Sequence, residues 1–183
     1  MKRFALIVLV VLALAAPALA QQVGTLGIFS DDQGNSCDLT DAGGGSLVTT
    51  YVVHKIGPGD GTTGVRFRIE PPAGATWSYA AFSTTFTPVG QANVDLAIGY
   101  GGCQTLSFSV GSALWVSLVA APACSWVTIK EGLTGVVLAT DCAFQEWTMP
   151  APHQAIVNPN GGCTCDDFAT NASTWGAIKA LYR

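Results

Sequence analysis

Short segments in which apolar and polar residues alternate recur along much of the chain, separated by glycine, proline, aspartate and asparagine. In the clearest, Val65–Glu70, three apolar residues alternate with two arginines and a glutamate before Pro71-Pro72. Such a period of two gives a β-strand one apolar face. Similar or continuously apolar segments predict further strands at residues 23–30, 47–56, 77–86, 93–98, 106–110, 113–120, 126–130 and 136–140. About nine short strands predict an all-β fold, a single antiparallel β-sandwich of the Ig-like type, with a jelly roll as the alternative.

The first twenty residues have the pattern of a secretory signal peptide. Lys2 and Arg3 precede an apolar run over residues 4–16, and residues 18–20 (Ala-Leu-Ala) form a small-x-small cleavage motif. We expect cleavage after Ala20 and a secreted, extracellular or cell-surface protein. The apolar run is short for a span of ~20 residues, and no later segment is long enough, so we expect no transmembrane helix in the mature chain.

The charge balance restricts the classes of partner. Loss of Lys2 and Arg3 from the eight basic residues leaves six against twelve acidic ones, a net charge of −6. Nucleic acids and anionic membranes attract basic surfaces, so neither is expected as a partner. No cofactor-binding motif occurs in the sequence, and calcium is the candidate metal ion.

All six cysteines follow the predicted cleavage site: Cys37, Cys103, Cys124, Cys142, Cys163 and Cys165. An even number of cysteines in an exported chain predicts disulfides. Cys124 and Cys142 lie symmetrically about residues 132–134, where a hairpin turn would place them opposite each other. We therefore expect a Cys124–Cys142 bond, with Cys103–Cys124 as its rival. Cys163 and Cys165 are expected to reach separate partners, Cys37 and Cys103.

The sandwich domain is expected to span residues 21–146, followed by a connector and a short C-terminal helix within residues 147–183. In the helix, Trp175, Ile178 and Leu181 form one apolar stripe. A helix of this length is not stable alone, so it is expected to dock on the sandwich.

Parts of the sequence resemble known proteins. Residues 174–182 (TWGAIKALY) resemble a TWGxIKxLY ending of uncharacterised exported bacterial proteins with a Cys-bearing β body. Residues 99–103 (GYGGC) and 163–165 (CTC) are similar to segments of the same proteins. This resemblance implies a bacterial surface or extracellular setting and carries no known activity. Residues 65–72 resemble strands of cohesin-like sandwich modules, which makes a cohesin-like sandwich an expectation beside the Ig-like one.

Catalytic residues are hard to identify in this sequence. A nucleophilic triad needs a histidine, and the two histidines, His54 and His153, lie in a predicted strand and in the connector. No Gly-x-Ser-x-Gly motif occurs. Three glutamates, Glu70, Glu131 and Glu146, would be the starting point for a carboxylate-dependent hydrolase, which is the alternative function.

One loop contains several oxygen ligands of the kind that calcium prefers. They are Asp31, Asp32, Asn35, Asp38 and Asp41. The spacing follows the EF-hand loop in part, without its final glutamate. The loop is a calcium candidate, although Asx residues also form turns for local reasons.

Five aromatic residues are candidates for a glycan-binding row. They are Trp77, Tyr79, Trp115, Trp126 and Trp147. Aromatic rings on an open face stack on sugar rings, whereas buried ones fill the core, which is the more common use of tryptophan.

These observations predict a non-enzymatic module that acts by binding or assembly at the cell surface. A protein partner or a surface assembly comes first and a glycan second, with the hydrolase as the alternative. A purely structural role is a third hypothesis, in which the stripe Trp175–Leu181 is exposed and mediates self-association.

Overall fold

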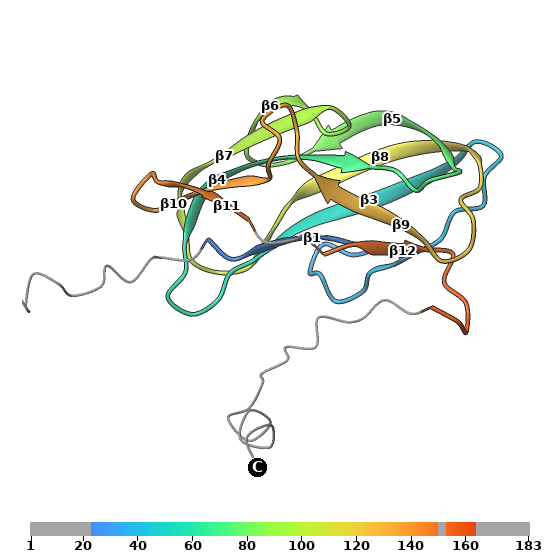
Figure 1. The fold of residues 1–183 in the computed structure, drawn as a ribbon, viewed down its shortest axis with the longest axis horizontal. Coiled ribbons are helices and arrows are strands. Elements are labelled where there is room, and N and C mark those ends of the chain that lie inside the picture. Colours follow the sequence, from blue (N-terminus) through green and yellow to red (C-terminus); the bar gives the residue numbers. More distant parts are fainter. Residues whose placement is uncertain (1–22, 150–152, 164–183) are drawn as a thin grey trace, which may run out of the picture.

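The computed structural model describes residues 23–149 and 153–163 (Figure 1). This part of the chain has no helix, and hence none able to cross a membrane. The predicted signal peptide and tail helix lie outside the described residues. Twelve strands are present: β1 Thr25–Phe29, β2 Asp38–Leu39, β3 Ser46–Lys55, β4 Thr62–Glu70, β5 Thr76–Ser83, β6 Thr87–Gln91, β7 Asp95–Gln104, β8 Phe108–Val119, β9 Ser125–Lys130, β10 Leu138–Asp141, β11 Glu146–Thr148 and β12 Ala155–Val157.

The strands form two sheets packed as a sandwich (Figure 1). The smaller sheet has the order β1-β3-β8-β5. The larger sheet is built around β4, whose residues 62–67 pair with β7 and whose residues 62–66 pair with β10. β6 continues the sheet beyond β7, and β11 continues it beyond β10. β9 pairs with residues 68–70 of β4 and leads on to β12 and β2.

The core lies between the two sheets, and the predicted alternation places its residues. β4 buries Val65, Phe67 and Ile69 and turns its arginines outward. Trp115 and Val52 of the smaller sheet are buried as well. Each buried side chain of this size contributes about 1.5–3 kcal/mol to stability, so the alternating strands define the inner and outer faces.

Two predicted strands, 106–110 and 113–120, are one strand in the structure. β8 runs through Gly111, where its pairing with β3 shifts register. A Cβ atom at Gly111 would lie 2.5 Å from the carbonyl oxygen of Ser83 on the neighbouring strand. Glycine is therefore needed here for a close approach of backbones rather than for a turn.

The predicted hairpin at residues 132–134 is wrong. β9 and β10 are both antiparallel to β4 and pair with successive parts of it, at residues 68–70 and 62–66. They therefore run in the same direction, one after the other, whereas the strands of a hairpin run in opposite directions. The loop 131–137 is an insertion between β9 and β10, which follow each other along β4 in the same direction.

The disulfide prediction fails for the same reason. The bonds are Cys103–Cys142 and Cys124–Cys163, with Cα–Cα distances of 5.2 and 5.8 Å. The predicted Cys124–Cys142 bond, its rival Cys103–Cys124 and the expected partners of Cys163 are all replaced. Cys37 is also disulfide-bonded, and Cys165 lies outside the described residues. Without a hairpin, Cys124 before β9 and Cys142 after β10 lie at opposite ends of the strand path.

The sandwich continues past the predicted boundary at residue 146. β11 pairs with β10, and β12 is inserted between β9 and β2. The three residues of β12 are all buried and apolar. Three residues are too few to show a period in the sequence, so the strand reads there as part of a connector.

Candidate functional site

A groove of about 620 Å³ lies on the outer face of the larger sheet, over β4, β7 and β10. Its floor includes Gly64 of β4 and Ala97 and Gly99 of β7, so backbone rather than side chains faces the solvent there. Among its lining residues the basic and acidic ones are Arg66 and Glu146. The groove thus has few charged residues.

Some glycines of the groove are required by close packing, whereas others have room for a side chain. A Cβ atom at Gly64 would lie 2.8 Å from the carbonyl oxygen of Ile98, so glycine is needed where β4 and β7 meet. At Gly99 and Gly102 an added Cβ atom would have no neighbour within 4 Å. Glycine inside a strand weakens it and often marks a place where another molecule approaches the backbone closely.

The GYGGC segment, residues 99–103, forms one wall of the groove. Gly99 of β7 pairs with Gly64 of β4, and Gln104 of β7 pairs with Thr62. Between these two pairs β7 has more residues than β4, so β7 forms a bulge. Tyr100 turns into the core, where its hydroxyl lies 3.0 Å from a ring nitrogen of His54.

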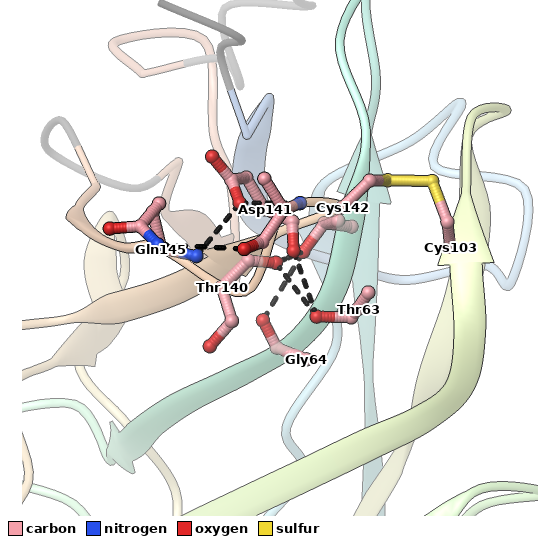
Figure 2. Close-up of a disulfide and its surroundings, with 9 residues drawn as sticks. Thr63, Gly64, Cys103, Thr140, Asp141, Cys142 and Gln145 are labelled. Carbon is pink, nitrogen blue, oxygen red and sulfur yellow. Dashed lines mark hydrogen bonds between the residues drawn. A yellow bond between two sulfur atoms is a disulfide. The ribbon is translucent and has the colours of Figure 1, made fainter.

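The Cys103–Cys142 disulfide closes this wall across the start of β4 (Figure 2). The Thr63 hydroxyl, which lies beneath it, donates hydrogen bonds to the carbonyl oxygens of Thr140 and Asp141, at 3.3 and 3.1 Å. The disulfide therefore joins the bulge of β7 to the end of β10, and the Thr63 hydrogen bonds join β10 to β4.

The turn between β10 and β11 presents Phe144 at the groove. Phe144 has φ 61° and a 76% exposed side chain. Asp141 holds the turn, because its Oδ1 accepts the backbone N–H groups of Ala143 and Gln145, both at 2.8 Å. The Trp147 indole donates to Asp141 Oδ2 at 2.9 Å. These hydrogen bonds, from Gln145 and Trp147 above all, hold the pKa of Asp141 below its ordinary value.

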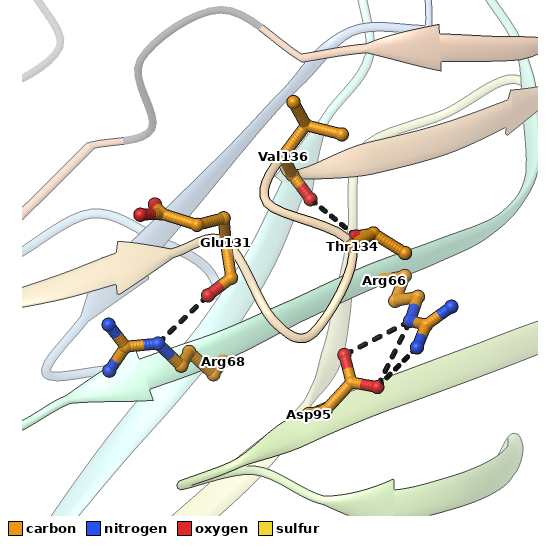
Figure 3. A network of polar contacts seen from close by, with 6 residues as sticks. All are labelled: Arg66, Arg68, Asp95, Glu131, Thr134 and Val136. Atoms are coloured by element: carbon orange, nitrogen blue, oxygen red, sulfur yellow. Dashed lines mark hydrogen bonds and ion pairs between the residues drawn. The ribbon is translucent and has the colours of Figure 1, made fainter.

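Asp95 of β7 binds Arg66, one of the lining residues of the groove (Figure 3). Arg66 Nε donates to Asp95 Oδ1 at 3.0 Å, and this contact lowers the pKa of Asp95. Asp95 also accepts the backbone N–H of Leu133, in the loop inserted between β9 and β10. Leu133 is 79% exposed. Arg66 and the backbone of Leu133 thus both bind the Asp95 carboxylate. The backbone of Leu133 is held in this way while its side chain stays in solvent.

A third exposed apolar residue comes from the edge strand β6. Val89 is 68% exposed and pairs in register with Ala97 of the floor. Directly paired residues lie on the same face of a sheet, so Val89 flanks the groove. We call Val89, Leu133 and Phe144 the rim residues.

The calcium candidates do not form one site. Asp31 accepts the backbone N–H groups of its own loop, from Gln33 at 2.9 Å and Ser36 at 2.6 Å. Asp41 is buried and accepts Trp77 Nε1 and the Ala121 N–H, both at 2.7 Å. Within the described residues no three His, Cys, Asp or Glu side chains are placed to hold a metal. Asp31 and Asp41 instead serve a turn and the packing of the core.

The predicted aromatic row is also not formed. Trp77 and Trp115 are buried with ring centres 6.0 Å apart, and Tyr79 packs edge-on against Trp115. Trp126 and Trp147 are partly exposed but belong to β9 and β11, which do not pair. The core uses three of the five residues, as hydrophobic burial favours.

His54 belongs to the core, and the pKa values of both histidines are lowered. His54 is fully buried between the Val23 carbonyl, 2.6 Å from Nε2, and the Tyr100 hydroxyl. Burial lowers the pKa of His54 to about 4, so the ring is neutral at pH 7. Burial and the charge of Lys55 lower the pKa of His153 to about 4 as well.

The predicted glutamates lie on different elements: Glu70 on β4, Glu131 in the loop after β9 and Glu146 on β11. Glu70 contacts Arg68 at 3.4 Å and Lys130 at 4.0 Å. Glu146 lines the groove, and its charge acts on Arg66. The loop carbonyl of Glu131 accepts Arg68 Nε at 2.8 Å (Figure 3).

No protein-family model and no curated protein matches the sequence. Among solved structures, a cohesin module from a Clostridium perfringens family 33 glycoside hydrolase matches with TM-score 0.53 and 10% identity over 76% of this chain and 100% of that module. The fold is a cohesin-like β-sandwich. A non-cellulosomal cohesin from the hyperthermophilic archaeon Archaeoglobus fulgidus matches with TM-score 0.50 and 10% identity, over 76% of this chain and 94% of that one. The all-β sandwich expected from the sequence is confirmed in its cohesin-like form.

Proposed function

We propose that this cohesin-like sandwich is a non-enzymatic module that binds a protein partner at the outside of a cell, through the groove over β4, β7 and β10. The observation that carries the proposal is a bare glycine floor lined by the exposed Phe144, with two further exposed apolar residues, Val89 and Leu133, beside it. Protein interfaces place apolar and aromatic side chains around surfaces that a partner can approach closely.

Phe144 contributes most to this proposal. Its φ of 61° is a conformation that glycine adopts freely and that costs other residues about 1 kcal/mol. The chain therefore holds a large apolar side chain in solvent at a position where its local geometry favours glycine. Strain of this kind at an exposed residue supports a role in binding.

The fold and the disulfides support the same function. The fold is similar to that of cohesin modules, which supports binding or assembly over the hydrolase alternative. Disulfides persist in oxidising compartments, which fits an extracellular location. A glycan remains the second candidate ligand, with the partly exposed Trp126 and Trp147 as its contacts.

A capture experiment with matched glycine variants tests the proposal. Gly99→Arg places a long side chain on the floor where a Cβ atom meets nothing, and Gly161→Arg does the same at an equally open glycine outside the groove. Proteins from the medium and surface of the source cells that the wild type retains are identified, purified and titrated by calorimetry.

We expect Gly99→Arg to weaken binding of the identified partner at least roughly tenfold, about 1.4 kcal/mol, and Gly161→Arg to leave it unchanged. Equal binding by all three proteins would place the interface elsewhere. Retention of glycans on an array, with no retained protein, would favour the second candidate.

A further inference from the structure

The outer face of the smaller sheet is apolar where β3 and β8 run side by side. Leu47 is 65% exposed and Leu118 55% exposed. Leu47 pairs in register with the half-buried Val116, and Leu114 pairs with Thr49, so these side chains share one face. A solvated face of an antiparallel sheet is normally polar. This face therefore has the character of a surface that something covers.

Charge is almost absent from this face. Of the thirty residues in β3, β5 and β8, one is a lysine and none is acidic. Lys55 stands at the far end of β3, where its ammonium donates to the carbonyl oxygen of Gln33 at 3.0 Å and lies 5.3 Å from the Phe29 ring centre. The occupant is thus expected to be apolar as well.

The chain covers the β1 end of the same face with its own segments. Phe29 and Val53 are buried there. A Cβ atom at Gly27 would meet Phe29 and His153, and Gly27 forms a bridge with His153. A loop and the segment at His153 therefore protect this end, whereas the end with Leu47 and Leu118 has no such cover among the described residues.

We propose that the C-terminal segment of this chain, residues 173–182, covers the Leu47–Leu118 end of this face as a short amphipathic helix. Trp175, Ile178 and Leu181 follow one another at helical spacing and supply an apolar stripe. The uncharged strands and the apolar stripe are complementary, and the sandwich provides the packing that so short a helix needs.

The covalent structure brings this segment to the correct end of the sandwich. Cys163 is bonded to Cys124, five residues after Val119 at the end of β8. Five residues span at most about 17 Å, and the ten residues from Cys163 to Ser173 span up to about 33 Å. A ten-residue helix is about 15 Å long, shorter than the twelve-residue strand β8 at about 40 Å. The tail therefore reaches the face without strain.

Attachment also lowers the affinity that docking requires. A segment held by a short tether has an effective concentration in the millimolar range. A few apolar contacts then suffice, and a second molecule of this protein would compete only at similar concentrations. This favours the chain's own tail as the occupant.

Trypsin cleavage after Lys179 measures docking in the intact, oxidised protein, because a docked helix must open before it is cleaved. The test compares the wild type with the double variant Leu47→Glu/Leu118→Glu, following loss of residues 180–183 by mass spectrometry. We expect cleavage roughly tenfold faster in the variant. The matched control is Val94→Glu/Leu106→Glu, two apolar residues of similar exposure outside this face, which should cleave like the wild type.

A second variant leaves the sandwich sequence untouched. Trp175→Ala should accelerate cleavage to a similar extent and lower the melting temperature. Wild-type cleavage as fast as that of a free peptide of residues 166–183 would overturn the proposal. So would sedimentation showing that the face variants turn a dimer into a monomer without changing the cleavage rate, because a second copy would then be the occupant.

Discussion

His54 illustrates how a residue that suggests catalysis in a sequence can belong to the core. Its neutral ring donates from Nε2 to the Val23 carbonyl and accepts the Tyr100 hydroxyl at Nδ1, so both nitrogens are satisfied. Tyr100, in turn, is the residue of the GYGGC segment that points inward. The wall of the groove is therefore anchored, through the buried His54 of β3, to the segment that precedes β1.

This burial predicts a pH dependence of stability. The unfolded His54 has a pKa near 6.5 and the folded one about 4, so between these values the unfolded state binds more protons. The free energy of unfolding should fall as the pH falls from 6.5 to 4, by about 3 kcal/mol for His54. Urea unfolding at several pH values measures this.

The His54→Gln variant identifies the group responsible. We expect it to be less stable at pH 7 but to lose less stability between pH 6.5 and 4. His153 titrates in the same range, so His153→Gln is the control that retains the His54 part of the slope. An unchanged slope in His54→Gln would contradict the assignment. The aspartates with lowered pKa values contribute only below about pH 4.

Phe144 predicts a conflict between stability and binding. Phe144→Gly removes the cost of a left-handed backbone, so the free energy of unfolding should rise by roughly 0.5–1 kcal/mol while affinity for the partner falls. Urea unfolding and calorimetric titration measure the two effects. Leu133→Gly is the control, since Leu133 is equally exposed but lacks a positive φ, and it should gain no stability. A destabilised Phe144→Gly would show that the side chain serves the fold.

At the scale of elements, β4 organises the larger sheet and the groove. The alternation of β4 was predicted from the sequence, because each of its side chains meets either core or solvent. The strands that pair with β4 were not predicted, because β9 and β10 can pair with successive parts of β4 only when residues 131–137 form an insertion between them. That loop is held by Asp95, which is distant in sequence. A symmetric pair of cysteines around a glycine therefore gave a wrong hairpin and a wrong disulfide.

The Cys103–Cys142 and Cys124–Cys163 disulfides give a matched prediction at this scale. Both join cysteines 39 residues apart, so the chain-entropy model gives each the same effect on the unfolded state, about 4 kcal/mol. Cys103→Ser/Cys142→Ser and Cys124→Ser/Cys163→Ser should lose similar stability in urea. Only the first should also weaken partner binding, because it opens the groove wall. Peptide mapping that finds Cys124 joined to Cys142 would contradict the structure.

At the scale of the whole molecule, export remains a prediction from the sequence. Val23, three residues after the predicted cleavage site, is already buried and bonded to His54. We expect the exported protein to begin at Gln21, which intact mass and N-terminal sequencing determine. An exported form that retains Met1, or one trimmed past Val23, would contradict this cleavage site.

The sequence by itself determined the fold class and which residues face the core, because alternation, turn residues and burial are local properties of a strand. It also identified the GYGGC segment, although through resemblance rather than chemistry. Only the tertiary structure decided which cysteines are bonded, which contacts the aspartates of residues 31–41 make, and where the groove lies. A groove arises where strands remote in sequence lie side by side, and an exposed Phe144 differs from other phenylalanines only in its backbone conformation. These properties come from packing, which no local pattern records.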